Sequence, residues 1–277
     1  MTNPKLSIVT INFNDKVGLQ RTIESVISQT YAGFEFIVID GGSTDGSKPL
    51  IESYSKHLTI WLSESDNGIY HAMNKGIRTA TGDYLLFLNS GDVLTDQAVL
   101  TTALEKIDGG ADLYYGNIHH KQKDKITEVI FPSKLTFDFF FDNNLSHQAT
   151  FIRRILFDNI FMYNENFKIA ADWEFFIYAI CKANVSYSHL NQFITVYDGA
   201  GISSDERNKK TITEERNITI SNYFPAFQED YERFSILRQR RVKQFLHIKE
   251  HRGAWEVLKV LMKIIILFIP KKNKRID

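Results

Sequence analysis

Cysteine is nearly absent from this chain of 277 residues, which contains Cys181 alone. A single cysteine excludes an intramolecular disulfide framework and fits a reducing compartment. No cysteines and histidines have the spacing of a zinc site, and the pair His119-His120 is too small to form one. A secretory signal is also missing, because residues 1–4 lead straight into the first apolar strand. We therefore expect a cytoplasmic protein.

Two common phosphate-binding motifs are missing as well. Neither G-x-G-x-x-G nor G-x-x-x-x-G-K-[ST] occurs in the chain. The glycines of "GGSTDGS", which follow Asp40, match neither pattern. Simple dinucleotide-binding and P-loop functions are therefore disfavoured.

Charge is balanced over the whole chain but unevenly distributed along it. Residues 231–277 contain 13 Lys and Arg against 4 Asp and Glu, and the remainder contains 20 against 29. An acidic body with a basic tail predicts an anionic surface as the partner of the tail. The acidic body does not favour nucleic acid as a partner.

What the chain does contain is an alternation of strand and helix signals. With 43% hydrophobic residues, it can bury a large core. Short runs rich in Val, Ile and Leu alternate with helical stretches, which predicts an α/β fold with a mostly parallel sheet flanked by helices. The expected strands are 6–12, 34–40, 58–63 and 83–89, and the expected helices are 17–29, 48–56 and 68–80.

The rhythm changes after about residue 110. We expect a hairpin from "DLYYGNI" and "KITEVIF", further strands at 147–153 and 193–198, and a helix over 171–184. From about residue 206 the pattern is helical to the end, interrupted by Pro225. This organisation predicts a main domain over residues 1–205 and a C-terminal helical extension over residues 206–277.

Several polar residues follow a predicted strand or begin a predicted helix. Asp92, in "YLLFLNSGDVL", either forms an ordinary turn or holds a metal ion at the mouth of the sheet. Asp40 and Asp66 are either caps of the following helices or acceptors for a nucleotide. Asp172 either caps its helix or acts as a general base. His147 is either a hydrogen-bonded core residue or a ligand.

Two basic residues, Lys75 and Arg78, lie on the third predicted helix. They either form a solvated helix face or neutralise a diphosphate, because lysine and arginine are the usual partners of phosphate groups. The sequence leaves both interpretations open.

Five segments in this order resemble family 2 glycosyltransferases with a GT-A fold: "LSIVTINFN", "VIDGGSTDGS", "DNGIYHAMNKGI", "GDYLLFLNSGDVL" and "ADWE". The resemblance covers roughly residues 4–200. It is strongest to the bacterial enzymes that build capsule, O-antigen or exopolysaccharide. It implies a GT-A domain followed by the helical extension.

The resemblance implies a nucleotide pocket built from the early loops. Thr10, Asn12 and Asn14 would line this pocket after the first strand. Asp40 is similar to the aspartate that reads the base, and Asp66 to the next aspartate around the nucleotide.

The same resemblance implies the reacting groups. Asp92 is similar to the aspartate that binds the divalent cation bridging the diphosphate, and Asp172 to the general base. His147 and the segment 201–203 are similar to segments on the acceptor side.

Three residues depart from the family pattern. Asn89 and Gly91 replace acids of the metal motif, and Ala171 replaces the glutamate before the base. A hard cation, Mg²⁺ or Mn²⁺, can still bind through one carboxylate, diphosphate oxygens and water. We therefore expect weak metal affinity in the absence of nucleotide.

The implied function is an inverting transfer of a sugar from a nucleotide-sugar donor, a UDP-sugar by preference, to a saccharide or polyprenyl-linked acceptor. One rival is a catalytically degenerate relative that binds nucleotide or acts as a scaffold, suggested by the reduced acidity of "NSGD". Another is a nucleotidyltransferase. That class favours a glycine- and lysine-rich loop near the first strand, which "TINFNDKVG" does not provide.

The tail contains one apolar helical run, residues 254–269. These 16 residues would extend about 24 Å, short of the roughly 30 Å hydrocarbon core of a bilayer. Glu256, Lys259 and Lys263 share one narrow face, and basic residues precede and follow the run. The pattern predicts a helix lying in the interface of an anionic membrane on its cytoplasmic side. The alternative is a helix that packs on the core or on a second subunit.

Overall fold

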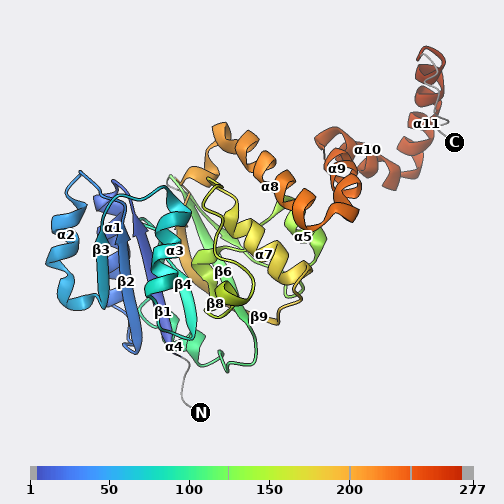
Figure 1. The fold of residues 1–277 in the computed structure, drawn as a ribbon. Coiled ribbons are helices and arrows are strands. Elements are labelled where there is room, and N and C mark those ends of the chain that lie inside the picture. Colours follow the sequence, from blue (N-terminus) through green and yellow to red (C-terminus); the bar gives the residue numbers. More distant parts are fainter. Residues whose placement is uncertain (1–4, 124, 200, 238, 270–277) are drawn as a thin grey trace. The chain divides into compact units, whose positions relative to one another are not determined.

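The computed structural model describes residues 5–123, 125–199, 201–237 and 239–269 (Figure 1). The chain divides after residue 223 into two compact units. The predicted boundary at residue 205 precedes helix α8 (Lys209–Tyr223), whereas the structure groups α8 with the first unit. The reason is packing, since α8 contacts helix α7 (Ala171–Cys181) and buries three side chains, Glu215, Thr219 and Ile220.

The first part of the sheet is parallel. Its strands lie in the order β3-β2-β1-β4, and every residue of β1 is buried. Because strand–helix–strand connections are right-handed, α1 and α2 cover one face and α3 covers the other (Figure 1). The elements are β1 (Leu6–Asn12), α1 (Lys16–Ile27), β2 (Phe34–Asp40), α2 (Ser47–Ser53), β3 (Ile60–Ser63), α3 (Ile69–Thr79) and β4 (Tyr84–Phe87).

Helix α3 lies unusually close to β1. A Cβ atom added to Gly76 on α3 would lie 2.3 Å from Cγ1 of Val9 on β1. A glycine is therefore needed at this crossing. The close approach brings the first turn of α3 to the carboxyl edge of the sheet.

The second part of the sheet is mixed. Strand β8 is antiparallel to both β4 and β6, and β6 is parallel to β9. As a result, β6 and β9 run in the same direction as β1 and β4. The elements are β5 (Val93–Leu94), α4 (Val99–Leu104), β6 (Leu113–Gln122), β7 (Lys125–Val129), α5 (Phe137–Asp142), β8 (Thr150–Arg153), α6 (Leu156–Asn159), α7 and β9 (Tyr187–Asp198). The predicted α/β class is confirmed, with the antiparallel pairs confined to this part.

Stacked aromatic rings hold α7 against the sheet. Phe87 on β4 contacts Tyr163 with ring centroids 5.8 Å apart, and Phe157 stacks on Phe175 of α7 at 4.6 Å. These rings are buried, and aromatic pairs of this kind contribute beyond the area they bury. The cluster fixes the start of α7 near the end of β4.

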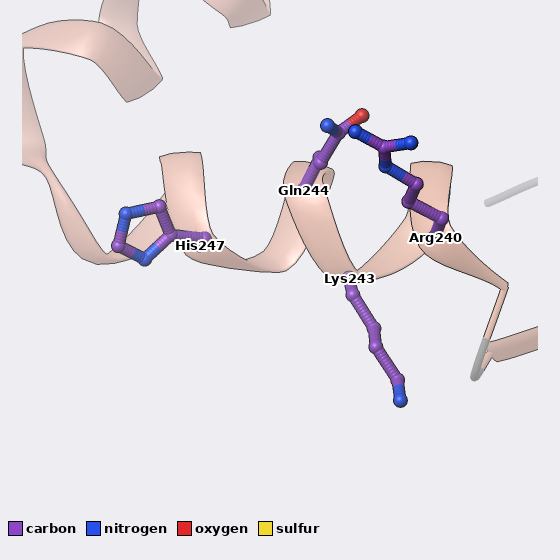
Figure 2. Close-up of a pocket in the computed structure, with 4 residues that line it drawn as sticks. All are labelled: Arg240, Lys243, Gln244 and His247. Atoms are coloured by element: carbon purple, nitrogen blue, oxygen red, sulfur yellow. The ribbon is translucent and has the colours of Figure 1, made fainter. Parts of the chain in front are cut away.

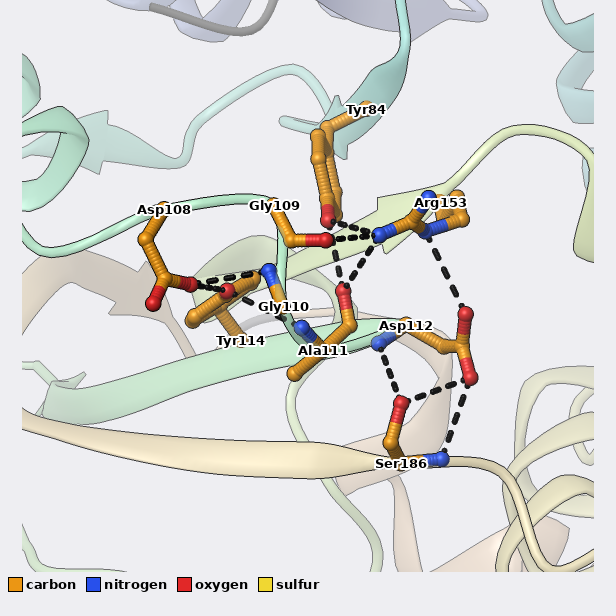
Figure 3. A network of polar contacts seen from close by, with 9 residues as sticks. All are labelled: Tyr84, Asp108, Gly109, Gly110, Ala111, Asp112, Tyr114, Arg153 and Ser186. Carbon is orange, nitrogen blue, oxygen red and sulfur yellow. Dashed lines mark hydrogen bonds and ion pairs between the residues drawn. The ribbon is translucent and has the colours of Figure 1, made fainter. Parts of the chain in front are cut away.

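A polar network joins the opposite, amino-terminal edge of the sheet (Figure 3). The guanidinium of Arg153 on β8 donates to the hydroxyl of Tyr84 at 3.0 Å and to the backbone carbonyl of Ala111 at 3.2 Å. It also forms an ion pair with Asp112 at 3.2 Å. The Asp112 carboxylate accepts in turn from both the N–H and the hydroxyl of Ser186. These bonds connect β4, β8, β6 and the approach to β9.

The described residues of the second unit form helices and the short turns between them. It contains α9 (Gln228–Leu237), α10 (Arg240–Glu250) and α11 (Arg252–Leu267). Helices α10 and α11 bury no residue, and they meet through the rings of Phe245 and Trp255 at 5.5 Å. No helix in the part of the chain that the structure describes is both long and apolar enough to cross a membrane.

Candidate active site

A cleft of about 690 Å³ lies where the carboxyl ends of β1, β4 and β9 meet. Its wall also includes the loop before α3, the short 3₁₀ helix His147–Ala149 and the first turn of α7. Six predicted site residues line it: Asn12, Asp66, Asn89, Asp92, His147 and Asp172. The segment 201–203 lines it as well. Residues from six separate stretches of the chain therefore face one space.

The turn that presents Asp92 is fastened to helix α1. Gly91 has φ +99°, a left-handed conformation that glycine adopts readily. Its N–H donates to the hydroxyl of Thr22 on α1 at 3.0 Å, and that hydroxyl donates to the carbonyl of Asp92 at 2.8 Å. The glycine that replaces an acid of the family motif thus shapes the turn.

The Asp92 carboxylate is 2% exposed and lies beside the end of β9. Its Oδ1 accepts from the N–H of Asp198 at 3.0 Å. Burial raises the pKa of Asp92 to about 6, the Asp198 carboxylate adds to the rise, and His147 opposes it. Asp198 is also paired with Arg21 of α1 at 3.0 Å. A buried negative charge of this kind is a place where a cation would be stabilised.

Asp172 is held by three side chains from three other parts of the chain. Its Oδ1 accepts from the Tyr70 hydroxyl at 3.0 Å, and its Oδ2 accepts from Asn144 Nδ2 at 2.8 Å. The Nδ1 atom of His147 lies 3.2 Å from the same Oδ2. Burial alone would raise the pKa of Asp172, but the hydrogen bonds from His147 and the Tyr70 hydroxyl lower it below its usual value. This carboxylate is therefore ionised at neutral pH.

His147 connects the two sides of the cleft. Its Nε2 atom lies 3.2 Å from Nδ2 of Asn89, next to the turn that carries Asp92. The ring meets Phe87 of β4 edge to face. With Nδ1 on Asp172 and Nε2 on Asn89, the imidazole bridges the strand end and the helix start.

The residues predicted for the nucleotide pocket divide into two groups. Asn12 lines the cleft and donates to Asp40 at 2.6 Å, whereas Asp40 itself is fully buried. Asp40 also accepts from Ser43 and Ser63, and these hydrogen bonds lower its pKa. Its polar atoms therefore hold the neighbouring loops in this structure.

Two further predicted residues lie off the cleft. The side chain of Thr10 is buried within β1, and Asn14, at φ +50°, accepts from the N–H of Thr44. Lys75 also lies off the cleft. Its ammonium group forms an ion pair with Glu64 at 2.8 Å, and this carboxylate balances the positive charge of Lys75. Asp66 does line the cleft, and its Oδ1 caps the N–H of Gly68 before α3.

Residues 7–161 match the family described as "Glycosyl transferase family 2". The chain belongs to this family. It is 39% identical over 186 residues to an uncharacterised glycosyltransferase of Mycobacterium tuberculosis, covering 65% of this chain and 71% of the relative. It is 30% identical over 207 residues to a PGL/p-HBAD biosynthesis glycosyltransferase of Mycobacterium bovis, covering 73% and 79%.

Solved structures of two transferases share the fold of this glycosyltransferase. Residues 1–349 of S. aureus TarS in complex with UDP-GlcNAc superimpose with a TM-score of 0.64 at 19% identity, covering 78% of this chain and 66% of that one. The chain spans 36% of the longer TarS structure. Mannosyltransferase PcManGT from Pyrobaculum calidifontis, with GDP-Man and Mn²⁺, gives 0.59 at 13% identity, covering 96% and 81%. The fold is GT-A, as the sequence motifs implied.

The carboxylates of the glycosyltransferase fit a divalent cation only in part. Asp92 is buried with a raised pKa and can offer a carboxylate oxygen, whereas the nearby Asp198 carboxylate is engaged by Arg21 at 3.0 Å. Within the described residues, no three side chains among His, Cys, Asp and Glu come together as a metal-binding group. The donor set therefore suits a cation that takes its remaining ligands from diphosphate and water.

Three residues that line the cleft, and one that contacts Asp172, were not predicted from the sequence. Asp198 ends β9, which was expected as a strand, so the rule that polar residues at strand ends form sites could have found it. Tyr70 and Phe13 lie inside the quoted motifs but were not singled out. Asn144 lies in a loop and carries no signal in the sequence, since only the fold brings it to Asp172.

Proposed function

We propose that this glycosyltransferase moves a sugar from a nucleotide-diphosphate donor to a hydroxyl of a saccharide or polyprenyl-linked saccharide, with inversion, in cell-surface polysaccharide synthesis. One observation carries the proposal. The carboxylates of Asp92 and Asp172 face one cleft, and His147 links Asp172 to Asn89, whose carbonyl accepts from the N–H of Asp92. A single-displacement transfer needs a group for the leaving diphosphate and a base for the acceptor, both within reach of one sugar.

Asp172 is the base in this proposal. Its lowered pKa keeps it ionised, and the Tyr70, Asn144 and His147 side chains fix the direction of its lone pairs. The acceptor hydroxyl loses its proton to Asp172 as its oxygen attacks the anomeric carbon and the diphosphate leaves. Positioned proton transfer of this kind contributes about 10²- to 10⁴-fold to a rate.

Asp92, with Asp198 beside it, forms the donor side. The Asp92 carboxylate would hold Mg²⁺ or Mn²⁺, which when bound supplies Lewis-acid stabilisation to the leaving diphosphate. Asn12 and Asp66 line the cleft at the ends of β1 and of the loop before α3, where they would position the nucleotide. TarS was solved with UDP and UDP-GlcNAc, and this supports a UDP-sugar as the donor.

A panel of nucleotide sugars tests the proposal. UDP- and GDP-linked hexoses and N-acetylhexosamines are incubated with the full chain and Mn²⁺, and release of nucleotide diphosphate is measured with and without saccharide acceptors. We expect turnover with a UDP-sugar and none with Asp172→Asn. Nucleotide binding without turnover of any donor would favour a degenerate, non-catalytic relative instead.

We also propose that the C-terminal helices hold the enzyme at the cytoplasmic face of a membrane, where a polyprenyl-linked acceptor would lie. Four apolar side chains of α11 are largely exposed: Val257, Val260, Ile265 and Leu267 are 57% to 82% exposed. Helix α10 carries exposed Arg240, Lys243 and His247 (Figure 2). Exposed apolar side chains beside basic ones are typical of helices that lie in an anionic interface. The basic residues predicted after position 270 lie outside the described residues.

Flotation with vesicles tests this part. The full chain and a chain ending at Tyr223, the end of the first compact unit, are mixed with phosphatidylglycerol and with phosphatidylcholine vesicles. We expect only the full chain to float, and only with the anionic vesicles. Equal flotation of both chains, or of neither, contradicts a membrane role for the second unit.

A further inference from the structure

We infer that Glu215, on helix α8, is a positioning residue for the proposed base Asp172. Helix α8 lies outside residues 7–161, the part that matches the family. The inference rests on the proposed function, because it concerns how the base of that reaction is held. It is carried by contacts that join α8 to the first turn of α7.

The Glu215 carboxylate accepts three backbone hydrogen bonds from consecutive residues. Its Oε1 accepts from the N–H of Lys168 at 2.6 Å, and its Oε2 accepts from Ile169 at 3.1 Å and Ala170 at 2.8 Å. Glu215 is only 6% exposed. A buried carboxylate that accepts hydrogen bonds from three consecutive amides fixes the backbone conformation of that segment.

These amides lead into α7, whose N-cap residue, Ala170, has no side chain that can accept a hydrogen bond. The N-cap amide has no partner within the helix, and a negative charge near a helix start is favourable. From a different helix, Glu215 binds this amide and the two before it, so residues 168–170 form a segment capped by Glu215. Asp172 lies in the first turn of α7, directly after this segment and Ala171.

The capped segment also contacts the base directly. The hydroxyl of Tyr70, which lies 3.0 Å from Asp172 Oδ1, is 2.5 Å from the carbonyl of Ile169. Ile169 itself lines the cleft. A shift of this segment would therefore move both the wall of the cleft and the hydroxyl that orients Asp172.

Arg216, the residue after Glu215, contacts the residue that follows Asp172. The guanidinium of Arg216 lies 4.8 Å from the ring centre of Trp173, which follows Asp172 in the sequence. The indole N–H of Trp173 donates to the carbonyl of Phe140 on α5 at 2.8 Å. One turn of α8 thus holds the residues on both sides of Asp172.

Three single variants of the full chain test the inference. Glu215→Gln keeps the size of the side chain but turns an N–H₂ group towards the amides. Glu215→Ala removes the cap. Glu214→Gln is the matched control, because Glu214 is the exposed neighbour on the same helix and its ion pair with Lys210 is long, at 3.7 Å.

Turnover and nucleotide affinity are measured separately, with kcat expressed per UDP-binding site. We expect kcat to fall about 10-fold in Glu215→Gln and about 10²-fold in Glu215→Ala, since a displacement of about 1 Å at a reacting centre can cost that much. UDP affinity should stay within about twofold in both, as it should in Glu214→Gln. A merely structural Glu215 would lower the number of UDP-binding sites and leave kcat per site unchanged, and that result overturns the inference.

Amide hydrogen exchange gives a readout that needs no turnover. Protection of residues 168–170 should fall at least about 10-fold in Glu215→Gln and stay unchanged in Glu214→Gln, because opening of a segment follows its local stability. If wild-type protein binds UDP but transfers no sugar, the proposed function fails. Exchange at 168–170 still decides whether Glu215 holds the segment, and unchanged protection in Glu215→Gln refutes it.

Discussion

The two edges of the sheet use charged side chains in opposite ways. At the amino-terminal edge, Arg153 and Asp112 are paired with each other and with the hydroxyls and carbonyls around them. At the carboxyl edge, Asp92 and Asp172 lie on a cleft, and the pKa of Asp92 is raised to about 6. The first arrangement is closed within the protein, and the second leaves a charge for a ligand to compensate.

The difference shows that one edge of the sheet contributes to the stability of the fold, while the other edge carries the groups proposed for the reaction. A network of internal hydrogen bonds and ion pairs stabilises the native state, because each bond made within the protein contributes to its stability. A carboxylate on a cleft contributes less to the native state and more to binding. We therefore expect substitutions at the two edges to affect different measurements.

The strongest test of this difference is Asp92→Asn. The amide can still accept from the N–H of Asp198, so the fold should be retained, but the charge on the donor side is lost. We expect transfer to fall at least about 10³-fold, as stabilisation of a leaving group by a cation is worth several kcal/mol. Sugar transfer with Mn²⁺ and with chelator is the measurement. Near-normal activity of the variant in chelator contradicts the role of Asp92.

Asp172→Asn tests the acceptor side of the same edge. The variant keeps the shape of the side chain but cannot take a proton. We expect turnover to fall by about 10²-fold or more while UDP affinity is retained. Calorimetric titration with UDP, alongside the transfer assay, separates the two effects. If affinity and turnover fall together, Asp172 belongs to the donor pocket.

Arg153→Met tests the amino-terminal edge, where we expect stability and not turnover to change. The substitution keeps the apolar stem but removes the bonds to Tyr84 and Ala111 and the ion pair with Asp112. We expect the free energy of unfolding to fall by about 2–3 kcal/mol, because hydrogen bonds from a charged guanidinium are lost, while Tyr84 and Ala111 stay bonded to each other. Thermal unfolding and kcat per folded molecule are measured together. A large loss of kcat without a loss of stability would show that the two edges are not independent.

Glu174→Gln tests a carboxylate that is buried but lies off the cleft. The Glu174 side chain is near α8 and is used neither for the proposed chemistry nor at the amino-terminal edge. Burial raises the pKa of Glu174 from 4.5 to about 7, the nearby Glu215 adds to the rise, and Asn164 and Thr219 oppose it. Between about pH 4.5 and 7 the folded protein keeps a proton that the unfolded chain has released, so stability falls as the pH rises through this window.

Because glutamine does not titrate, the stability of Glu174→Gln does not fall for this reason as the pH rises. Relative to wild type, we expect it to gain stability between pH 4.5 and 7, by on the order of 3 kcal/mol at most. Chemical denaturation at several pH values measures the difference. A constant difference across the window would show that Glu174 does not titrate on unfolding.

The sequence predicted the alternating strands and helices because burial on both faces makes β1, β2 and β4 predominantly apolar. It also indicated Asp92 and Asp172 as candidate site residues, since each lies where an apolar element ends or begins. It did not predict that Asp40 and Lys75 are engaged by Ser63 and Glu64. Those partners depend on side-chain directions that periodicity does not specify.

The boundary after Tyr223 and the contacts of Asp198 depend on packing between distant segments. Asp198 reaches Asp92 across 106 residues of sequence, and Glu215 reaches Ala170 across 45. No local pattern records such a pairing. The roles assigned to the site residues accordingly remain predictions for the experiments above.

The position of β9 in the sheet has a consequence for synthesis of the chain. It is the last strand in sequence, yet it lies between β6 and β5, inside the sheet. While a ribosome is still adding residues 187–198, β6 has an open edge on that side, and unpaired strand edges promote association with other chains. The growing polypeptide therefore passes through a stage in which its sheet is unfinished and in need of protection, and Asp198 completes the sheet and reaches the cleft in the same event.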